Sequence, residues 1–298
     1  MTQIELATPR QGRIAMRLFE PPAGTLPALQ VVLAPAMGVP QRYYAEFAGW
    51  LAAQGVRALT FDYRGHGDSL ALLPSRRVRH VDADLLDWRS DYEAAVQHLH
   101  QRAPQVPLLL LGHSLGGQLP GLFERSAPIA GLLAVAAGSG YWRQNAPPTR
   151  RRALLMWHGL VPVLTPLFGY FPGQRLGAVG DLPAGVIRQW RRWCLHPRYS
   201  GAEGPAALAR YAAVDYPIHA LAIDDDEMLT LDSTQHLLAL YARAPQRIER
   251  VAPADHGLAR IGHLGWFHPR FQATLWPRTW QALRALAAEG PARAPAAA

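Results

Sequence analysis

Lysine is absent from this chain of 298 residues, and all 30 of its basic residues are arginine. The formal net charge of +8 would by itself favour an anionic partner such as nucleic acid. The complete lack of lysine, with abundant alanine and proline, instead indicates a bias toward GC-rich codons. The arginines are spread along the chain, with local clusters at residues 76–79, 150–152 and 191–192 but no basic stripe with interleaved stacking aromatics. We therefore expect no nucleic-acid partner and interpret the clusters as solvated faces. Weak attraction to anionic substrates or membrane surfaces is the less favoured interpretation.

Cysteine is also nearly absent. The single Cys194 excludes an intramolecular disulfide and a cysteine-based metal site, and we expect neither a metal nor an organic cofactor. No apolar run approaches the length of a membrane span, and residues 1–10 contain no apolar stretch of the signal-peptide type. We expect a cytoplasmic protein without stable membrane insertion, and the sequence leaves its oligomeric state open.

Short apolar runs and amphipathic segments alternate along most of the chain. The pattern predicts strands at residues 4–6, 14–19, 29–34, 56–61, 108–111, 131–136, 217–223 and 247–251. It predicts helices at residues 43–53, 84–100, 233–243 and 272–288. This alternation is typical of an α/β protein with a mostly parallel, doubly wound sheet, and the first two strands predict an antiparallel N-terminal edge. The functional site is expected at the carboxyl ends of the strands.

Residues 139–211 break this regularity. Their aromatic residues lie among scattered prolines and glycines, and include Trp142, Trp157, Phe168, Phe171, Trp190 and Trp193. We predict a helical cap here, inserted after the sixth strand of a core formed by residues 1–138 and 212–288. Most of the aromatics are expected to form the cap's own core, and a few to line an apolar substrate pocket. Residues 289–298, rich in proline and alanine, predict a disordered tail.

The most informative motif is Gly-His-Ser-Leu-Gly at residues 112–116, directly after the apolar run 108–111. Gly-x-Ser-x-Gly at the end of a buried strand is the pattern of a nucleophile elbow. A strand that reverses sharply into a helix brings backbone against backbone, which favours glycine on both sides of the turn. Ser114 is therefore the expected nucleophile, with the backbone amide of Leu115 at a helix N-terminus as one oxyanion donor.

An activated serine needs a base, and the base needs a carboxylate that orients it. The acid is expected among Asp224, Asp225 and Asp226, which follow the strand 217–223. We favour Asp226 and place Asp225 second, because Asp226 is followed by one free position and then by two apolar residues, Met228 and Leu229. The remaining possibility is a solvated acidic turn.

Two histidines compete for the role of the base after the strand 247–251. His263 follows a glycine and precedes an apolar run, which suits a loop that swings an imidazole toward the serine. His256 lies nearer the strand, between Asp255 and Gly257, and is more typical of a turn. We favour His263, and we expect the other histidines, His113 included, to be structural.

The second oxyanion donor is expected in the loop after the strand 29–34. Met37 by position supplies its backbone amide there, and Gly38 allows the turn. Because only the N–H of Met37 enters the chemistry, its side chain is expected to be nearly free to vary.

Over almost its whole length the chain resembles the α/β-hydrolase superfamily. The resemblance rests on residues 112–117, on Asp-Tyr-Arg-Gly-His-Gly-Asp-Ser at 62–69, and on the late Asp and Gly-His. Within the superfamily, segments 35–44 and 261–267 are similar to a bacterial group of predicted hydrolases related to serine aminopeptidases and monoacylglycerol lipases. The resemblance implies the α/β-hydrolase fold and a Ser-His-Asp hydrolase of carboxylic esters or similar acyl compounds.

Two classes of function follow. The favoured one is a carboxylesterase-like or lipase-like serine hydrolase acting on a small, apolar acyl substrate, with Ser114, His263 and Asp226 as its triad and Met37 and Leu115 as its oxyanion hole. Thioesterase, lactonase, amidase and peptidase activities share the same carbonyl chemistry and stay open. The second class is a non-catalytic protein that uses the same fold to bind an apolar ligand.

Overall fold

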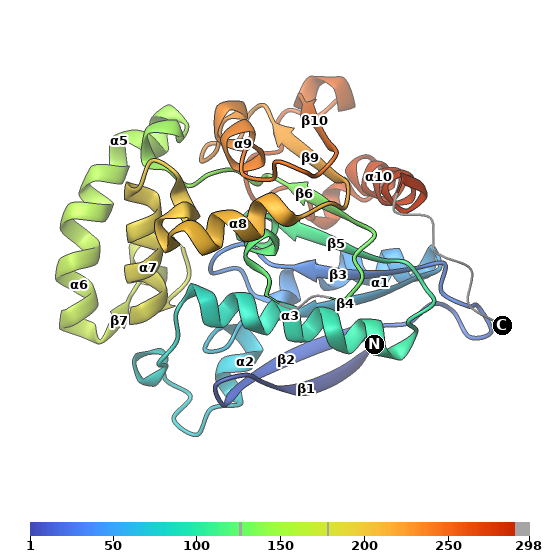
Figure 1. The fold of residues 1–298 in the computed structure, drawn as a ribbon, viewed down its shortest axis with the longest axis horizontal. Helices are drawn as coiled ribbons and strands as arrows, with labels where there is room; N and C mark the ends of the chain where they lie inside the picture. Colours follow the sequence, from blue (N-terminus) through green and yellow to red (C-terminus); the bar gives the residue numbers. More distant parts are fainter. Residues whose placement is uncertain (125–126, 178, 290–298) are drawn as a thin grey trace.

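Eight strands form one central sheet in the described part of the chain, which in this computed structural model comprises residues 1–124, 127–177 and 179–289 (Figure 1). The strand order is β1-β2-β4-β3-β5-β6-β9-β10. The strands are β1 (Thr2–Thr8), β2 (Gly12–Phe19), β3 (Leu29–Ala34), β4 (Val56–Phe61), β5 (Leu108–His113), β6 (Gly131–Val135), β9 (Ile218–Ile223) and β10 (Gln246–Val251).

The sheet is antiparallel only at its N-terminal edge. β1 pairs antiparallel with β2, and β2 antiparallel with β4, whereas every later pair from β4 to β10 is parallel. The parallel strands β3, β5, β6 and β9 are buried along their whole length, which explains why their sequences are apolar apart from Gln30, His113 and His219. The predicted α/β class and sheet arrangement are confirmed.

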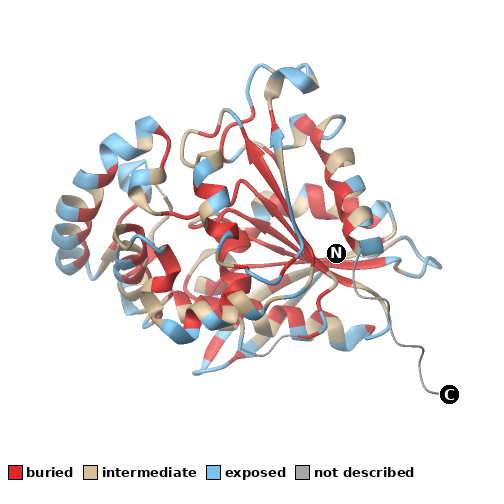
Figure 2. Ribbon diagram, turned by 45° about the horizontal axis from the view of Figure 1, so that its top comes forward, coloured by how far each residue is buried: buried red, intermediate tan, exposed pale blue. Residues whose placement is uncertain are grey.

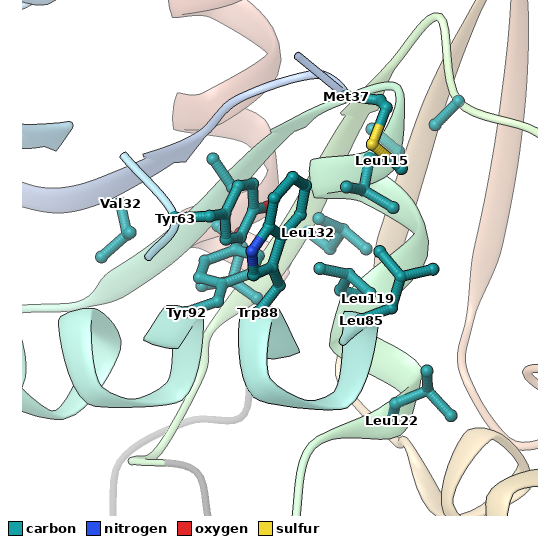
Figure 3. Close-up of a cluster of buried hydrophobic side chains, with 14 of the residues drawn as sticks. Val32, Met37, Tyr63, Leu85, Trp88, Tyr92, Leu115, Leu119, Leu122 and Leu132 are labelled. Carbon is teal, nitrogen blue, oxygen red and sulfur yellow. The ribbon is translucent and has the colours of Figure 1, made fainter. Parts of the chain in front are cut away.

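Helices cover both faces of the sheet and produce two apolar layers. The core helices are α1 (Ala45–Ala53), α2 (Gly67–Ala71), α3 (Leu85–Arg102), α4 (Leu115–Gln118), α9 (Leu231–Leu238) and α10 (Leu275–Glu289). α1 and α10 bury Phe47 and Trp276 against one face. α3 buries Trp88 and Tyr92 against the other, and Figure 3 shows these two rings packed with Tyr63 and with leucines from α4 and its continuation.

Helix ends follow local capping chemistry. α3 begins after Asp84, whose carboxylate accepts hydrogen bonds from the amides of Leu86 and Asp87, and the Asp87 side chain returns to the Asp84 amide. α9 begins two residues earlier than predicted, because Thr230 caps it in the same reciprocal way with Ser233, and it ends at Leu238 rather than at the predicted residue 243. Glu289, predicted as the first residue of the tail, instead ends α10. The rest of that predicted tail, 290–298, lies outside the described residues.

Residues 139–211 form a mostly helical layer over the carboxyl ends of the strands. Its elements are α5 (Pro147–Leu155), a π-helical turn (Met156–Leu160), α6 (Val161–Phe168), β7 (Tyr170–Phe171), β8 (Leu182–Pro183), α7 (Ala184–Leu195) and α8 (Pro205–Ala213). β7 and β8 form a separate two-stranded ladder. We keep the name cap for residues 139–211, although α8 crosses their end and packs beside the sheet (Figure 1). No helix in the described ranges combines the length and the apolar character that a membrane span needs.

Candidate active site

Ser114 stands at a sharp turn between β5 and α4. Its backbone angles are φ 50° and ψ −110°, which is a strained conformation for a residue with a side chain. The two glycines of the motif make the turn possible. A Cβ on Gly112 would lie 2.3 Å from the Gly116 carbonyl oxygen, and one on Gly116 would lie 2.3 Å from the Ala34 carbonyl oxygen. Both positions therefore exclude any larger residue.

The helix after the elbow is shorter than the sequence suggests. α4 spans Leu115–Gln118 and continues as a 3-10 turn over Leu119–Leu122. Pro120 has no amide hydrogen to continue the α-helical ladder. Four residues produce little cumulative dipole, so an anion beside Ser114 would depend on individual amide groups rather than on the helix as a whole.

The structure brings Ser114, His263 and Asp226 into one hydrogen-bonded chain. His263 Nε2 lies 3.0 Å from Ser114 Oγ, and His263 Nδ1 lies 2.7 Å from Asp226 Oδ2. Because a carboxylate only accepts, Nδ1–H donates to Asp226 and leaves Nε2 free to accept the Ser114 hydroxyl. All three side chains are buried. The arrangement can transfer a proton from the serine to the imidazole and stabilise the resulting charge.

Asp226 is held by its own loop. The amides of Met228 and Leu229 donate to Asp226 Oδ1 at 2.7 and 2.9 Å, while Oδ2 faces His263. The spacing of one free and two apolar residues after the acid thus has a structural meaning, because the two apolar residues supply the amides that fix the carboxylate.

The acidic neighbours of Asp226 fasten the loop that carries His263. Asp225 accepts from the amides of Ile261 and Gly262 at 2.9 and 3.0 Å, and Glu227 accepts from the amide of His263 at 3.1 Å. Asp225, the second choice for the acid, therefore contacts the backbone of the histidine loop rather than its imidazole. The acidic run is a set of anchors, which the interpretation as a solvated turn does not explain.

The other late histidines lie elsewhere. His256 ends the 3-10 turn Pro253–His256 and is half-buried. His268 caps the turn Pro269–Phe271 by accepting from the Arg270 amide. Neither ring forms a hydrogen bond with Ser114 or Asp226 in the described part of the chain.

Met37 and Leu115 both border the space in front of Ser114. The turn that holds Met37 is closed by the Val39 amide, which donates to the Ala36 carbonyl at 3.1 Å, and Gly38 adopts φ 69° there. The Met37 side chain is buried and packs near Leu115 at the end of the apolar cluster (Figure 3). The expectation that this side chain is nearly free to vary is therefore wrong, because the residue also fills core volume.

A second polar chain runs behind the elbow; a structural role for His113 was expected from the sequence, but its partner Tyr44 was not. The Ala36 amide donates to Tyr44 Oη at 3.0 Å, Tyr44 Oη lies 2.8 Å from His113 Nδ1, and His113 Nε2 lies 2.9 Å from the His263 carbonyl oxygen. The carbonyl only accepts, so His113 Nε2–H donates to it and Tyr44 O–H donates to His113 Nδ1. We call Tyr44 and His113 the relay.

Burial keeps the relay neutral. His113 is fully buried, and desolvation lowers its pKa to about 3. Desolvation likewise raises the pKa of Tyr44 well above its usual value. A neutral His113 with a fixed tautomer ties the backbone of the Met37 turn to the backbone of His263. The signal available in the sequence was the histidine placed directly before Ser114.

A cavity of about 590 Å³ opens beside Ser114, between the core and the cap. Such a volume suits a small organic ligand. Two of the six cap aromatics noted in the sequence, Trp157 and Trp190, contribute to its wall. The cap also contributes Ala153, Met156, Val179 and Cys194. Among the described residues, no group of three or more His, Cys, Asp or Glu side chains is placed to hold a metal ion.

Comparison with solved structures finds hydrolases of the same fold. A soluble variant of monoglyceride lipase from Saccharomyces cerevisiae, in complex with a substrate analog, matches with a TM-score of 0.64 and 15% identity, over 98% of this chain and 96% of that one. A lipase in an open form matches with a TM-score of 0.64 and 16% identity, over 96% and 99% of the two chains. Est1E from Butyrivibrio proteoclasticus matches with a TM-score of 0.58 and 13% identity, over 97% and 100%. At such identities the likeness shows the fold alone.

A family model described as serine aminopeptidase, S33, matches residues 26–256. The match covers more than half of the chain and includes Ser114 and Asp226. It ends before His263, the histidine that lies 3.0 Å from Ser114. The chain therefore belongs to the serine aminopeptidase S33 family of the α/β-hydrolase superfamily.

Proposed function

We propose that this protein hydrolyses carboxylic esters through a covalent acyl-enzyme on Ser114. The observation that carries the proposal is the buried chain from Ser114 through His263 to Asp226, at 3.0 and 2.7 Å, beside a mainly apolar cavity. A strained serine, a correctly oriented base and a carboxylate held by two amides are the parts that nucleophilic acyl transfer needs.

In the first half of the reaction, Ser114 Oγ attacks the ester carbonyl carbon as its proton passes to His263 Nε2. The carbonyl electron pair moves to oxygen, and the amides of Met37 and Leu115 donate to that oxyanion. Collapse of the tetrahedral intermediate expels the alcohol, which takes the proton from His263. Ser114 is left as an acyl ester.

In the second half, water attacks the acyl carbon and gives its proton to His263. The new tetrahedral intermediate collapses, the carboxylic acid leaves, and the proton returns to Ser114 Oγ. The Asp226 side chain stabilises the imidazolium that forms twice in each cycle. The relay connects the His263 carbonyl to the amide of Ala36, beside the Met37 turn, through hydrogen bonds.

The walls of the cavity favour an ester over an aminopeptidase substrate. An aminopeptidase needs a carboxylate for the substrate's ammonium group. Among the described residues that line the cavity, Glu227 is the one carboxylate, and it already accepts from the His263 amide and lies 3.3 Å from Arg260. The cap side of the cavity is mainly apolar, which suits an acyl chain.

The test is a panel of p-nitrophenyl acetate, butyrate and octanoate, a matched butyryl thioester, and leucine p-nitroanilide. We expect ester hydrolysis to exceed anilide hydrolysis, and Ser114→Ala to lower ester kcat/KM by at least about 10⁴-fold. His263→Ala should cause a comparable loss, whereas His256→Ala should leave the rate nearly unchanged. Undiminished ester hydrolysis by Ser114→Ala, or anilide hydrolysis faster than ester hydrolysis, would contradict the proposal.

A further inference from the structure

The net charge of the protein is concentrated in the cap. Residues 139–211 carry ten arginines against two acidic residues, Asp181 and Glu203. The rest of the chain carries twenty arginines against twenty acidic residues. The arginine excess of residues 139–211 therefore equals the whole formal charge of +8, which a uniform coding bias does not explain.

The cap also carries most of the exposed apolar side chains. Of the nine large hydrophobic residues that are exposed in the described chain, six lie between residues 154 and 176. They are Leu154, Leu155, Val163, Leu167, Phe168 and Leu176. Leu155, Val163 and Leu167 are 63%, 61% and 71% exposed, which is costly in water unless something covers them.

A continuous helix from α5 through the π-helical turn to α6 carries five of these six residues, and Leu176 follows in the 3-10 turn Gln174–Leu176. The buried positions of the continuous helix are Ala153, Trp157, Val161 and Thr165, one in every four residues. The π-helical turn adds a residue and so keeps this buried stripe in line with the cap interior. The outward side of these helices is exposed (Figure 2), and its exposed residues include Leu154, Leu155, Val163 and Leu167 together with Arg150, Arg151, Arg152 and His158. We call this outward face of residues 147–168 the cap patch.

Arginines border the cap patch at both ends. Arg150 and Arg151 are exposed near its beginning, and neither forms an ion pair within the described residues. Arg175 is exposed beyond its end, with its guanidinium 5.9 Å from the ring centroid of Phe168. An exposed apolar centre with cationic ends is the composition of a helix that lies in a lipid headgroup layer.

The cap patch is the outer side of the wall that encloses the cavity. Met156 and Trp157, on the inner side of the same helix, line the cavity beside Ser114. Leu264 also lines the cavity and is 46% exposed. Figure 1 places α5 and α6 at one edge of the molecule, away from α10.

We propose that the cap patch docks the protein on an anionic phospholipid bilayer, with Leu155, Val163 and Leu167 among the acyl chains and the arginines against the phosphates. Charge complementarity selects an anionic surface, and the apolar centre selects lipid over nucleic acid, because DNA offers phosphate but no hydrocarbon to cover these leucines. The proposal does not depend on the esterase assignment, because docking requires no chemistry at Ser114.

Sedimentation with vesicles of phosphatidylglycerol and phosphatidylcholine, using the Ser114→Ala protein, measures docking apart from catalysis. We expect binding to the mixed vesicles, little binding to pure phosphatidylcholine, and loss of binding in high salt. The double variant R150Q/R151Q should bind roughly 30-fold more weakly, since each arginine near the surface contributes about a five-fold gain. The control R243Q/R284Q removes the same charge from exposed core positions and should bind as the parent does.

The apolar half of the proposal is tested with L155Q/L167Q, which keeps every charge. We expect this variant to bind vesicles more weakly than the parent but to be retained equally on double-stranded DNA. When Ser114 is restored, the variant should hydrolyse soluble p-nitrophenyl acetate at the parent's rate. Equal vesicle binding by R150Q/R151Q and R243Q/R284Q would overturn the proposal. So would full vesicle binding by L155Q/L167Q, or tighter binding of the parent to DNA than to the vesicles.

Discussion

The core and the cap of this protein differ in charge balance and in how many apolar side chains they expose. The core has as many acidic as basic residues, and the polar groups around Ser114 are matched donor to acceptor. The cap has a large excess of arginine and leaves apolar side chains in water. The charge-balanced core holds the hydrogen-bonded chain from Ser114 to Asp226, whereas a charged and partly apolar cap suits contact with something outside the protein. The polar groups around Ser114 and the exposed apolar and cationic surface thus belong to different segments of the chain.

The two regions meet closely at the turn that holds Met37 and Gly38. A Cβ on Gly180 of the cap would lie 2.6 Å from the Gly38 carbonyl oxygen. The adjoining contact between α7 and the start of α3 is polar, with Gln189 Oε1 accepting from the Leu85 amide at 2.5 Å. The cap is therefore placed against the core by backbone fit as well as by hydrogen bonds.

The largest expected effect separates Asp226 from its neighbour. Asp226→Asn should lower ester kcat/KM by about 10⁴-fold, because an amide no longer fixes the tautomer of His263 or stabilises its charge. Asp225→Asn is the matched control, since that carboxylate accepts hydrogen bonds from the amides of residues 261 and 262 and not from the His263 ring. We expect it to cost less than about 100-fold. Steady-state kinetics on p-nitrophenyl butyrate measure both, and equal losses would remove the distinction drawn between the two acids.

A smaller effect is expected where core and cap touch. Gly180→Ala should displace the Gly38 turn and lower kcat/KM by about 100-fold, because small misplacements of an oxyanion donor are costly. Gly159→Ala is the control in the same cap, where the new methyl group would lie 3.2 Å from the mobile end of Leu155. We expect the control to stay within about five-fold of the parent. Thermal melting checks that both variants are folded, and an active Gly180→Ala would show that this contact does not position the turn.

The smallest effect concerns stability against pH. His113 has a pKa of about 3 in the folded protein, against 6.5 for an ordinary histidine. Below pH 6.5 His113 binds a proton in the unfolded chain but not in the folded protein, so the free energy of unfolding decreases as the pH falls. At pH 5 this decrease should be about 2 kcal/mol. Urea titrations should show that the free energy of unfolding of His113→Gln depends less on pH than that of the parent. The pKa of His219 is also lowered, but this residue is present in both proteins and contributes equally to each.

Much of the core was predictable because each local pattern has one physical meaning. A buried parallel strand followed by Gly-x-Ser-x-Gly leaves few alternatives to a tight elbow. The apolar pair after Asp226 marks the amides that hold its carboxylate. These features depend on residues within a few positions of one another, which a sequence displays directly.

The relay and the cap patch were not predictable in the same way. Tyr44, His113 and His263 come from three distant parts of the chain, and no spacing connects them. The cap patch depends on one π-helical turn that decides which residues of 147–168 face outward. The arginine clusters were visible in the sequence, but their one-sided excess acquired meaning only with the exposed leucines beside them.

The most direct measurement for the central claim is covalent labelling of the folded protein with a fluorophosphonate, followed by peptide mass mapping. We predict one adduct, on Ser114, that is absent from Ser114→Ala and from protein unfolded before labelling. It should form much more slowly in Asp226→Asn than in Asp225→Asn. No adduct on the folded protein, or an adduct that persists in Ser114→Ala, would contradict the account.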